Sequence, residues 1–155
     1  MNNIKIDSTA EIIGKVRIGN GSIISQGTIL KSEDNSIKIA NDAFVLENSV
    51  IIGTRKNPVE IGSKTVFGHK CTVIGAKVGE LCEVGNSVTI LEGSVIGDRC
   101  IFGEGSVIPP NSVIPDESVV LGRPYKILRK LNDEDLEMIK RMRRGDININ
   151  PYEVV

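Results

Sequence analysis

The 155-residue sequence has no tryptophan, and aromatic residues make up only 3% of it, so few large rings are available to build a core. Hydrophobic residues nevertheless form 40% of the chain, and valine and isoleucine are abundant among them. β-Branched side chains pack well on the pleated surface of a sheet. The composition therefore favours an all-β protein whose core consists of stacked aliphatic ladders.

Neither sign of charge dominates, since 19 basic and 20 acidic residues leave a net charge of −1. We therefore expect neither a nucleic acid nor an anionic membrane as a partner. No apolar run approaches the ~18 residues that a membrane-spanning helix needs, and we find no secretory segment. These absences predict a cytoplasmic protein.

Cysteine is scarce, and the spacing of Cys71, Cys82 and Cys100 is not that of a disulfide framework. An odd number of cysteines without such spacing favours a reducing compartment. Cys82 and Cys100 are 18 residues apart, and a disulfide between them is one interpretation. The preferred interpretation is that both are small apolar fillers of the core.

The strongest positive feature is an apolar residue at every sixth position. One uninterrupted phase comprises Val78, Val84, Ile90, Ile96, Phe102, Ile108, Ile114 and Val120. Three earlier phases comprise Ile6, Ile12, Ile18, Ile24 and Leu30, then Ile39, Val45 and Ile51, then Ile61, Phe67 and Val73. A period of six is typical of a β-solenoid, in which short strands coil into a stacked prism.

The repeats predict a parallel β-helix over residues 1–122. Roughly 19 hexads, at three per turn, give about six coils, and a strand spacing of ~4.8 Å makes the prism about 29 Å tall. Residues 123–145 are expected to form an exit turn and a C-terminal α-helix that packs on the prism. Asn132 is the expected N-cap of this helix, and Gly145 follows its last turn. Residues 146–155 are expected to be a tail.

The residues that follow the inward apolar positions sort into three columns, as a three-sided prism requires. One column is mostly glycine, which is typical of corners that need a positive φ or a close backbone approach. Another column lies outside the inward-facing set yet is largely aliphatic: Ile13, Lys31, Ile52, Ile74, Leu91 and Pro109. A contiguous exposed apolar stripe marks a partner surface. We predict a homotrimer through the face that bears Ile13, Ile52, Ile74 and Leu91.

The sequence contains one histidine, His69, which occupies an outward position of its hexad. Glu47 and Asn86 are expected one coil away on either side. Three interpretations are open: an ion pair that stabilises the stack, a general base, and a metal ligand.

Several segments resemble the gamma-class carbonic anhydrases, which are left-handed β-helices. Residues 31–39 match a turn of that family in length, residues 45–52 and 67–75 match its histidine-bearing segments, and residues 120–136 match its exit turn and C-terminal helix. The resemblance covers nearly the whole chain. It implies a left-handed helix and a trimer with zinc or iron held between adjacent subunits.

The same resemblance implies a metal site that lacks most of the family's ligands. His69 matches one metal histidine, whereas the other two positions hold Ile52 and Ile74. The arginine position of the family holds Lys31, the glutamine position Leu46, and the two aspartate positions Glu33 and Glu47. A zinc site needs about three nitrogen-rich ligands and an open position. We therefore expect no bound cofactor, with zinc or iron disfavoured, and no competent carbonate dehydratase. His69, Glu47 and Lys31 are the candidate catalytic residues.

Two other functions are compatible with the sequence. Hexapeptide acyltransferases resemble it in the repeat and in residues 122–126, and His69 would then be the general base that activates an acceptor for an acyl-CoA. The other alternative is a non-enzymatic assembly or scaffold subunit that uses the prism faces.

Overall fold

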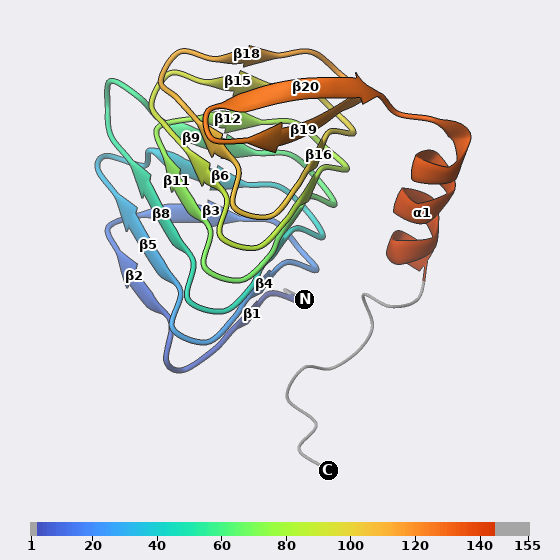
Figure 1. The fold of residues 1–155 in the computed structure, drawn as a ribbon. Coiled ribbons are helices and arrows are strands. Elements are labelled where there is room, and N and C mark those ends of the chain that lie inside the picture. The colour runs from blue at the N-terminus through green and yellow to red at the C-terminus, as the bar shows by residue number, and fades with distance from the viewer. Residues whose placement is uncertain (1–2, 145–155) are drawn as a thin grey trace.

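The computed structural model describes residues 3–144, and side chains as far as Arg141. Its strands coil into a three-sided prism, so the predicted all-β, left-handed parallel β-helix of about six coils is confirmed (Figure 1). Each coil contributes one short strand to each of three parallel sheets, named here sheets A, B and C.

Sheet A contains seven parallel strands and one antiparallel strand: β1 (Lys5–Ile6), β4 (Ile23–Ile24), β7 (Phe44–Val45), β10 (Val66–Phe67), β13 (Glu83–Val84), β16 (Ile101–Phe102), β19 (Ser118–Gly122) and β20 (Tyr125–Lys130). Sheet B contains β2 (Glu11–Ile13), β5 (Ile29–Ser32), β8 (Val50–Gly53), β11 (Thr72–Ile74), β14 (Thr89–Ile90) and β17 (Val107–Ile108). Sheet C contains β3 (Val16–Ile18), β6 (Ile37–Ile39), β9 (Val59–Ile61), β12 (Lys77–Val78), β15 (Val95–Ile96) and β18 (Val113–Ile114).

The apolar residues of the six-residue repeat form the interior of the prism. Their fully buried members include Ile24, Leu30, Ile51, Phe67, Val73, Ile90, Phe102, Ile108 and Ile114. Because strands of adjacent coils pair in register, each inward side chain stacks on its counterpart about 4.8 Å away. The sequence periodicity is thus converted directly into continuous aliphatic ladders.

The cysteines are buried and free, as the core-filler interpretation predicts. The register pairs Glu83 with Ile101, which places Cys82 directly below Cys100. The Cys82 and Cys100 thiols donate to the carbonyls of Gly97 and Pro115, at 3.2 and 3.3 Å. The side-chain hydrogen bond with Cys100, together with burial, raises the pKa of Cys82 well above its ordinary value. The thiol form of Cys82 is therefore favoured.

The glycine column is required by close backbone approach at the corner between sheets C and A. A Cβ added to Gly79 would lie 2.5 Å from the carbonyl oxygen of Gly97 in the next coil. The positive φ of this corner falls two residues further on, at Leu81 (φ 56°) and Arg99 (φ 54°). Left-handed conformations are uncommon for such residues, so the coil geometry imposes them.

The chain leaves the prism through a strand that the sequence analysis does not anticipate. After a turn at residues 123–124 the chain runs back as β20, which pairs antiparallel with β19. Tyr125 packs against the core, and the inward residues of the last coil, Ile114 and Val120, are 1% and 0% exposed. The last coil is therefore closed.

Helix α1 (Asp133–Arg144) follows and lies beside sheet A (Figure 1). Ile139 on this helix is 2% exposed. Its N-terminus forms a capping box: Asp135 N–H donates to Asn132 Oδ1, and Asn132 N–H donates to Asp135 Oδ2, both at 2.9 Å. The N-cap expected at Asn132 is confirmed. Residues 145–155, which include the predicted tail, lie outside the described residues.

We expect Asp135→Ala to destabilise α1 by about 1 kcal/mol at pH 7, because it removes half of the capping box. Hydrogen bonds from Arg129 and from the backbone of Asn132 lower the pKa of Asp135 below its ordinary value. This stabilisation is therefore complete above the ordinary aspartate pKa of about 3.9 and is lost as the pH falls through the lower folded value. Urea unfolding followed by the helical circular dichroism signal at pH 7 and in acid measures the difference. Glu134→Ala in the same helical turn is the control, and an equal effect of both variants at pH 7 would contradict the prediction.

Candidate functional site

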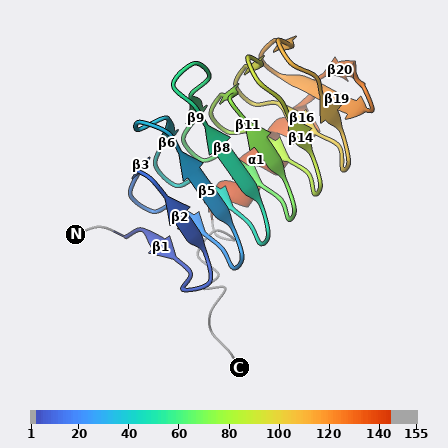
Figure 2. The same ribbon diagram turned by 90° about the vertical axis from the view of Figure 1, so that its left-hand side faces the viewer.

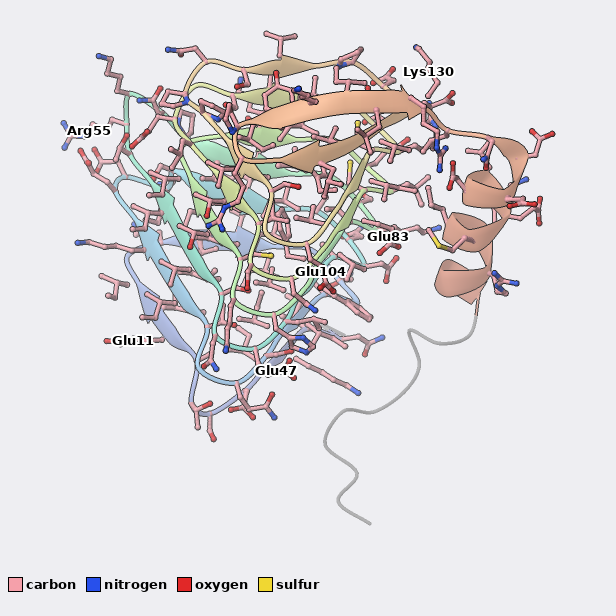
Figure 3. All side chains as sticks on the ribbon, in the orientation of Figure 1. Glu11, Glu47, Arg55, Glu83, Glu104 and Lys130 are labelled. Carbon is pink, nitrogen blue, oxygen red and sulfur yellow. The ribbon has the colours of Figure 1, made fainter. Side chains whose placement is uncertain are left out.

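The corner between sheets A and B carries a line of polar side chains at equivalent positions of successive coils. We call this set the corner ladder: Gln26, Glu47, His69, Asn86 and Glu104. Each member follows a sheet A strand by two residues, so the parallel register stacks them along one edge. Glu47 and Glu104 lie along this edge in Figure 3, far from Arg55 at another corner.

His69 is held from both sides within the corner ladder. Its Nε2 lies 2.9 Å from Glu47 Oε2, and its Nδ1 lies 3.1 Å from Asn86 Oδ1. The backbone N–H of His69 also donates to Asn86 Oδ1, at 2.8 Å. The sequence-based expectation that Glu47 and Asn86 flank His69 is therefore confirmed.

The orientation of Asn86 determines which nitrogen of His69 carries a proton. Asn86 Nδ2 donates to Glu104 Oε1 at 3.1 Å, so Oδ1 must face His69 and can only accept. Nδ1 of His69 therefore carries a hydrogen. If Nε2 carries none, the buried Glu47 Oε2 has no donor among the described residues. The His69–Glu47 contact is an ion pair only when both ring nitrogens carry a hydrogen.

We expect Asn86→Ala to lower the free energy of unfolding by about 1–2 kcal/mol, because it leaves the backbone N–H and the ring of His69 without their acceptor. Chemical denaturation measures this change. The adjacent exposed Ser87 is outside the corner ladder, so Ser87→Ala should change stability by no more than about 0.5 kcal/mol. Equal effects of the two variants would show that the corner ladder contributes nothing specific.

The third candidate catalytic residue, Lys31, lies elsewhere. Lys31 is on β5, where it pairs in register with Ile13 of β2 and Ile52 of β8. Ile52 in turn pairs with Ile74 of β11. His69 lies just before the N-terminal end of β11, a strand of sheet B. The column of Ile13, Lys31, Ile52 and Ile74 lies toward the C-terminal ends of the sheet B strands. Within one chain the structure therefore brings His69 and Glu47 together and leaves Lys31 apart from them.

Glu33, which matches one of the aspartate positions, is also separate from His69. It lies at the corner between sheets B and C, where the Arg55 guanidinium pairs with Asp34 and lies 3.5 Å from Glu33. Within residues 3–144, no three histidine, cysteine, aspartate or glutamate side chains of one chain gather in a way that could hold a metal ion.

The outer surface of sheet B, which we call the B face, is the apolar face that the sequence analysis predicts (Figure 2). Ile13 is 43% exposed, and Ile52, Ile74 and Leu91 are half-buried. Each alternates with an inward residue of its strand, as Ile52 does with the buried Ile51. A second outward column adds Ile29, Val50 and Val107, which the sequence analysis does not single out.

The other two faces differ from the B face. The outward column of sheet C begins with the charged residues Arg17, Lys38, Glu60 and Lys77 and turns apolar only at Val95 and Val113. Sheet A has α1 beside it, and Figure 2 places α1 behind the prism when the B face is in front. The B face is thus the apolar face that no element of the described chain covers. No helix among the described residues is long and apolar enough to cross a membrane.

The fold and its repeat define a hexapeptide-repeat protein, and residues 75–110 match the family model described as "Bacterial transferase hexapeptide (six repeats)". A carbonic anhydrase from Geobacillus kaustophilus is 34% identical over 141 residues, which cover 91% of this chain and 78% of that protein. The chain therefore belongs to the gamma carbonic anhydrase-like family.

One further relative and one solved structure are similar to the chain. Gamma carbonic anhydrase 2, a mitochondrial protein of Arabidopsis thaliana, is 29% identical over 95% of this chain, but the chain spans only 55% of that protein. A hexapeptide transferase family protein from Anaplasma phagocytophilum has a similar crystal structure, with a TM-score of 0.77, 24% identity, and coverage of 93% of this chain and 89% of that one. This last likeness concerns the fold alone.

Three of the five members of the corner ladder, Glu47, His69 and Asn86, are predicted from the sequence. Gln26 and Glu104 are not predicted. Glu104 is 18 residues after Asn86, and this offset, the length of one regular coil, is the signal that could have found it.

Proposed function

We propose that this chain is a homotrimeric member of its family whose metal site has been replaced by an apolar contact, and that it does not hydrate carbon dioxide. The observation that carries the proposal is the register pair of Ile52 and Ile74, which face outward on adjacent strands of the B face. By the family resemblance these are the positions of two metal ligands. Isoleucine has no donor atom, so these residues do not fit a zinc or iron ion.

The contacts of His69 also support the loss of the metal site. A histidine binds a metal through an unprotonated ring nitrogen. Here Asn86 engages Nδ1, and Glu47 engages Nε2. To bind a metal, Nε2 would have to break its contact with the Glu47 carboxylate. With one histidine and two isoleucines, the site lacks the donor set that acidifies a zinc-bound water.

The trimer is supported by the contrast between the faces. Ile13, Ile52, Ile74 and Leu91 form a stripe along the B face that is interrupted once, by Lys31. A stripe of this kind, left open on one chain, fits an interface between copies of the chain. Three copies around one axis would bring the corner ladder of one protomer next to the B face of its neighbour.

A carbon dioxide hydration assay on the purified protein, with zinc or iron added, tests the proposed loss of activity. We expect a rate indistinguishable from buffer, and the same rate for His69→Ala. Hydration that depends on added metal and disappears in His69→Ala would contradict the proposal, because it would show that His69 still supports a working metal centre.

Acyl transfer is the second candidate, favoured by the geometry of His69. A carboxylate and an amide oxygen orient its ring, and Nε2 could act as a general base only after it leaves Glu47 and contacts the acceptor. If an acyl-CoA is a substrate, millimolar acetyl-CoA should raise the melting temperature, because a ligand that binds only the folded state stabilises it. An unchanged melting temperature would exclude this candidate and leave the non-enzymatic assembly role.

A further inference from the structure

The two ends of the prism differ in how well they are closed. In the last coil, which β20 follows, the inward residues Ile114 and Val120 are at most 1% exposed. In the first coil the equivalent residues are open, since Ile6 is 44% exposed, Ile12 is 38% exposed and Ile18 is half-buried. The core therefore ends in an apolar opening at the first coil, which we call the open end.

The backbone at the open end has a free edge (Figure 2). Among the described residues, β1, β2 and β3 each pair with one strand only, namely β4, β5 and β6. The amides of Lys5 and Asp7 donate to the carbonyls of Ser22 and Ile24 in the second coil, at 3.0 and 2.9 Å. Because backbone groups alternate in direction along a strand, the N–H and C=O of Ile6 point to the free edge. An apolar edge of this kind is a template for pairing with another chain.

We propose that the open end is a contact between two copies of this chain, in which β1 of one copy pairs antiparallel with β1 of the other about a twofold axis at Ile6. Residues directly opposite each other in antiparallel strands can exchange both of their hydrogen bonds. The free N–H and C=O of Ile6 do so with Ile6 of the second copy, and both open ends are covered at once. This contact leaves the B face free, so it is compatible with the proposed trimer and does not depend on it.

The charges beside Ile6 complement themselves in this arrangement, because Lys5 of each copy lies opposite Asp7 of the other. Opposite charges across antiparallel strands are stabilising, whereas like charges are destabilising. Lys5 is exposed and forms no ion pair within the described chain. The hydroxyl and the backbone N–H of Thr9 donate to Asp7 Oδ2, at 2.5 and 2.9 Å, and these bonds lower the pKa of Asp7. The carboxylate is therefore charged at neutral pH, and its Oδ1 faces no donor among the described residues.

The same axis also brings opposite charges together at the other two edges. A twofold axis perpendicular to sheet A passes through the opposite corner of the prism, so it exchanges sheets B and C. Strand β2 of one copy therefore lies over β3 of the other. Glu11 is the only charged residue of β2, and Arg17 is the only charged residue of β3. An acidic edge thus faces a basic edge on both of these sides.

The contact is small, because one coil end offers only three inward side chains, whereas a stable interface buries about 1,600 Å². We therefore expect it to form reversibly, at protein concentrations of about 100 μM and above. In dilute solution the mass remains that of the unit formed through the B face, and it rises as the concentration increases.

Sedimentation equilibrium of the full chain, over a concentration series that spans this range, tests the proposal. Lys5→Asp places like charges opposite each other in two symmetric pairs, so it should weaken the association about tenfold. Lys5→Asp/Asp7→Lys restores both pairs with the signs exchanged and should recover the association. Lys38→Asp, on sheet C away from the open end, changes the net charge of the chain as Lys5→Asp does and should have no effect. Urea unfolding of each variant verifies that it is folded.

Three results would overturn the proposal. The first is a mass of the unaltered chain that does not rise with concentration, which would show that the open end is covered in another way. The second is equal association of Lys5→Asp and the unaltered chain. The third is a double variant that associates no better than Lys5→Asp, because antiparallel pairing centred on Ile6 requires residues 5 and 7 to lie opposite each other.

Discussion

Ile74→Asp is expected to reduce the mass of the protein in solution from about three chains of 16.8 kDa to one. Ile74 lies in the middle of the B face, between Ile52 on one side and Leu91 on the other. In a trimer the substitution would bury three carboxylates in apolar surroundings, and each unpaired buried charge costs several kcal/mol. Light scattering coupled to size-exclusion chromatography measures the mass.

Val113→Asp is the matched control for this experiment. Val113 is an aliphatic residue on sheet C that is 71% exposed, so the same kind of charge is introduced outside the B face. We expect the mass of this variant to equal that of the unaltered protein. A trimeric Ile74→Asp, or dissociation by Val113→Asp alone, would show that the subunits meet through a different face.

Ile52→His/Ile74→His is expected to create a zinc site where, on our proposal, the unaltered protein has none. Because these residues pair in register on adjacent parallel strands, their side chains project from the same face about 4.8 Å apart. Two imidazoles at this separation can share one tetrahedral ion at Zn–N distances of about 2.0–2.1 Å. By the family resemblance, His69 of the neighbouring protomer would be the third ligand.

Equilibrium dialysis against zinc, followed by metal analysis, measures this gain. We expect about one ion per subunit for the double variant, and weaker binding when His69→Ala is added, since a ligand is then lost. Failure of the trimeric double variant to bind zinc would contradict our assignment of Ile52 and Ile74 to the lost ligand positions.

Most of the fold is predictable because each inward position of the repeat has the same environment. The six-residue period fixes which residues face inward, and the shifts from one phase to the next fall at turns such as residues 54–58. The pairing of Glu47, His69 and Asn86 follows from the same periodicity, since parallel in-register strands stack equivalent residues. A solenoid repeats one local interaction, so local spacing carries most of its tertiary information.

The features that escaped prediction depend on contacts outside the repeat. Strand β20 departs from the hexad pattern, and its antiparallel pairing is favoured by the free edge that β19 would otherwise leave. Only one of the two outward columns on the B face is predicted from the sequence. That column follows the inward residues marked by the period, whereas Ile29 and Val50 of the other column precede them. The sequence does not tell whether Gly79 is needed for a positive φ or for close backbone approach, and the structure shows close approach.

The metal content of the native protein tests the central claim most directly. The protein should be purified without chelator from cells supplied with zinc and iron, confirmed as a trimer, and analysed by inductively coupled plasma mass spectrometry. The replacement of two ligand positions by Ile52 and Ile74 predicts far less than one metal ion per subunit. About one zinc or iron ion per subunit, lost in His69→Ala, would contradict it.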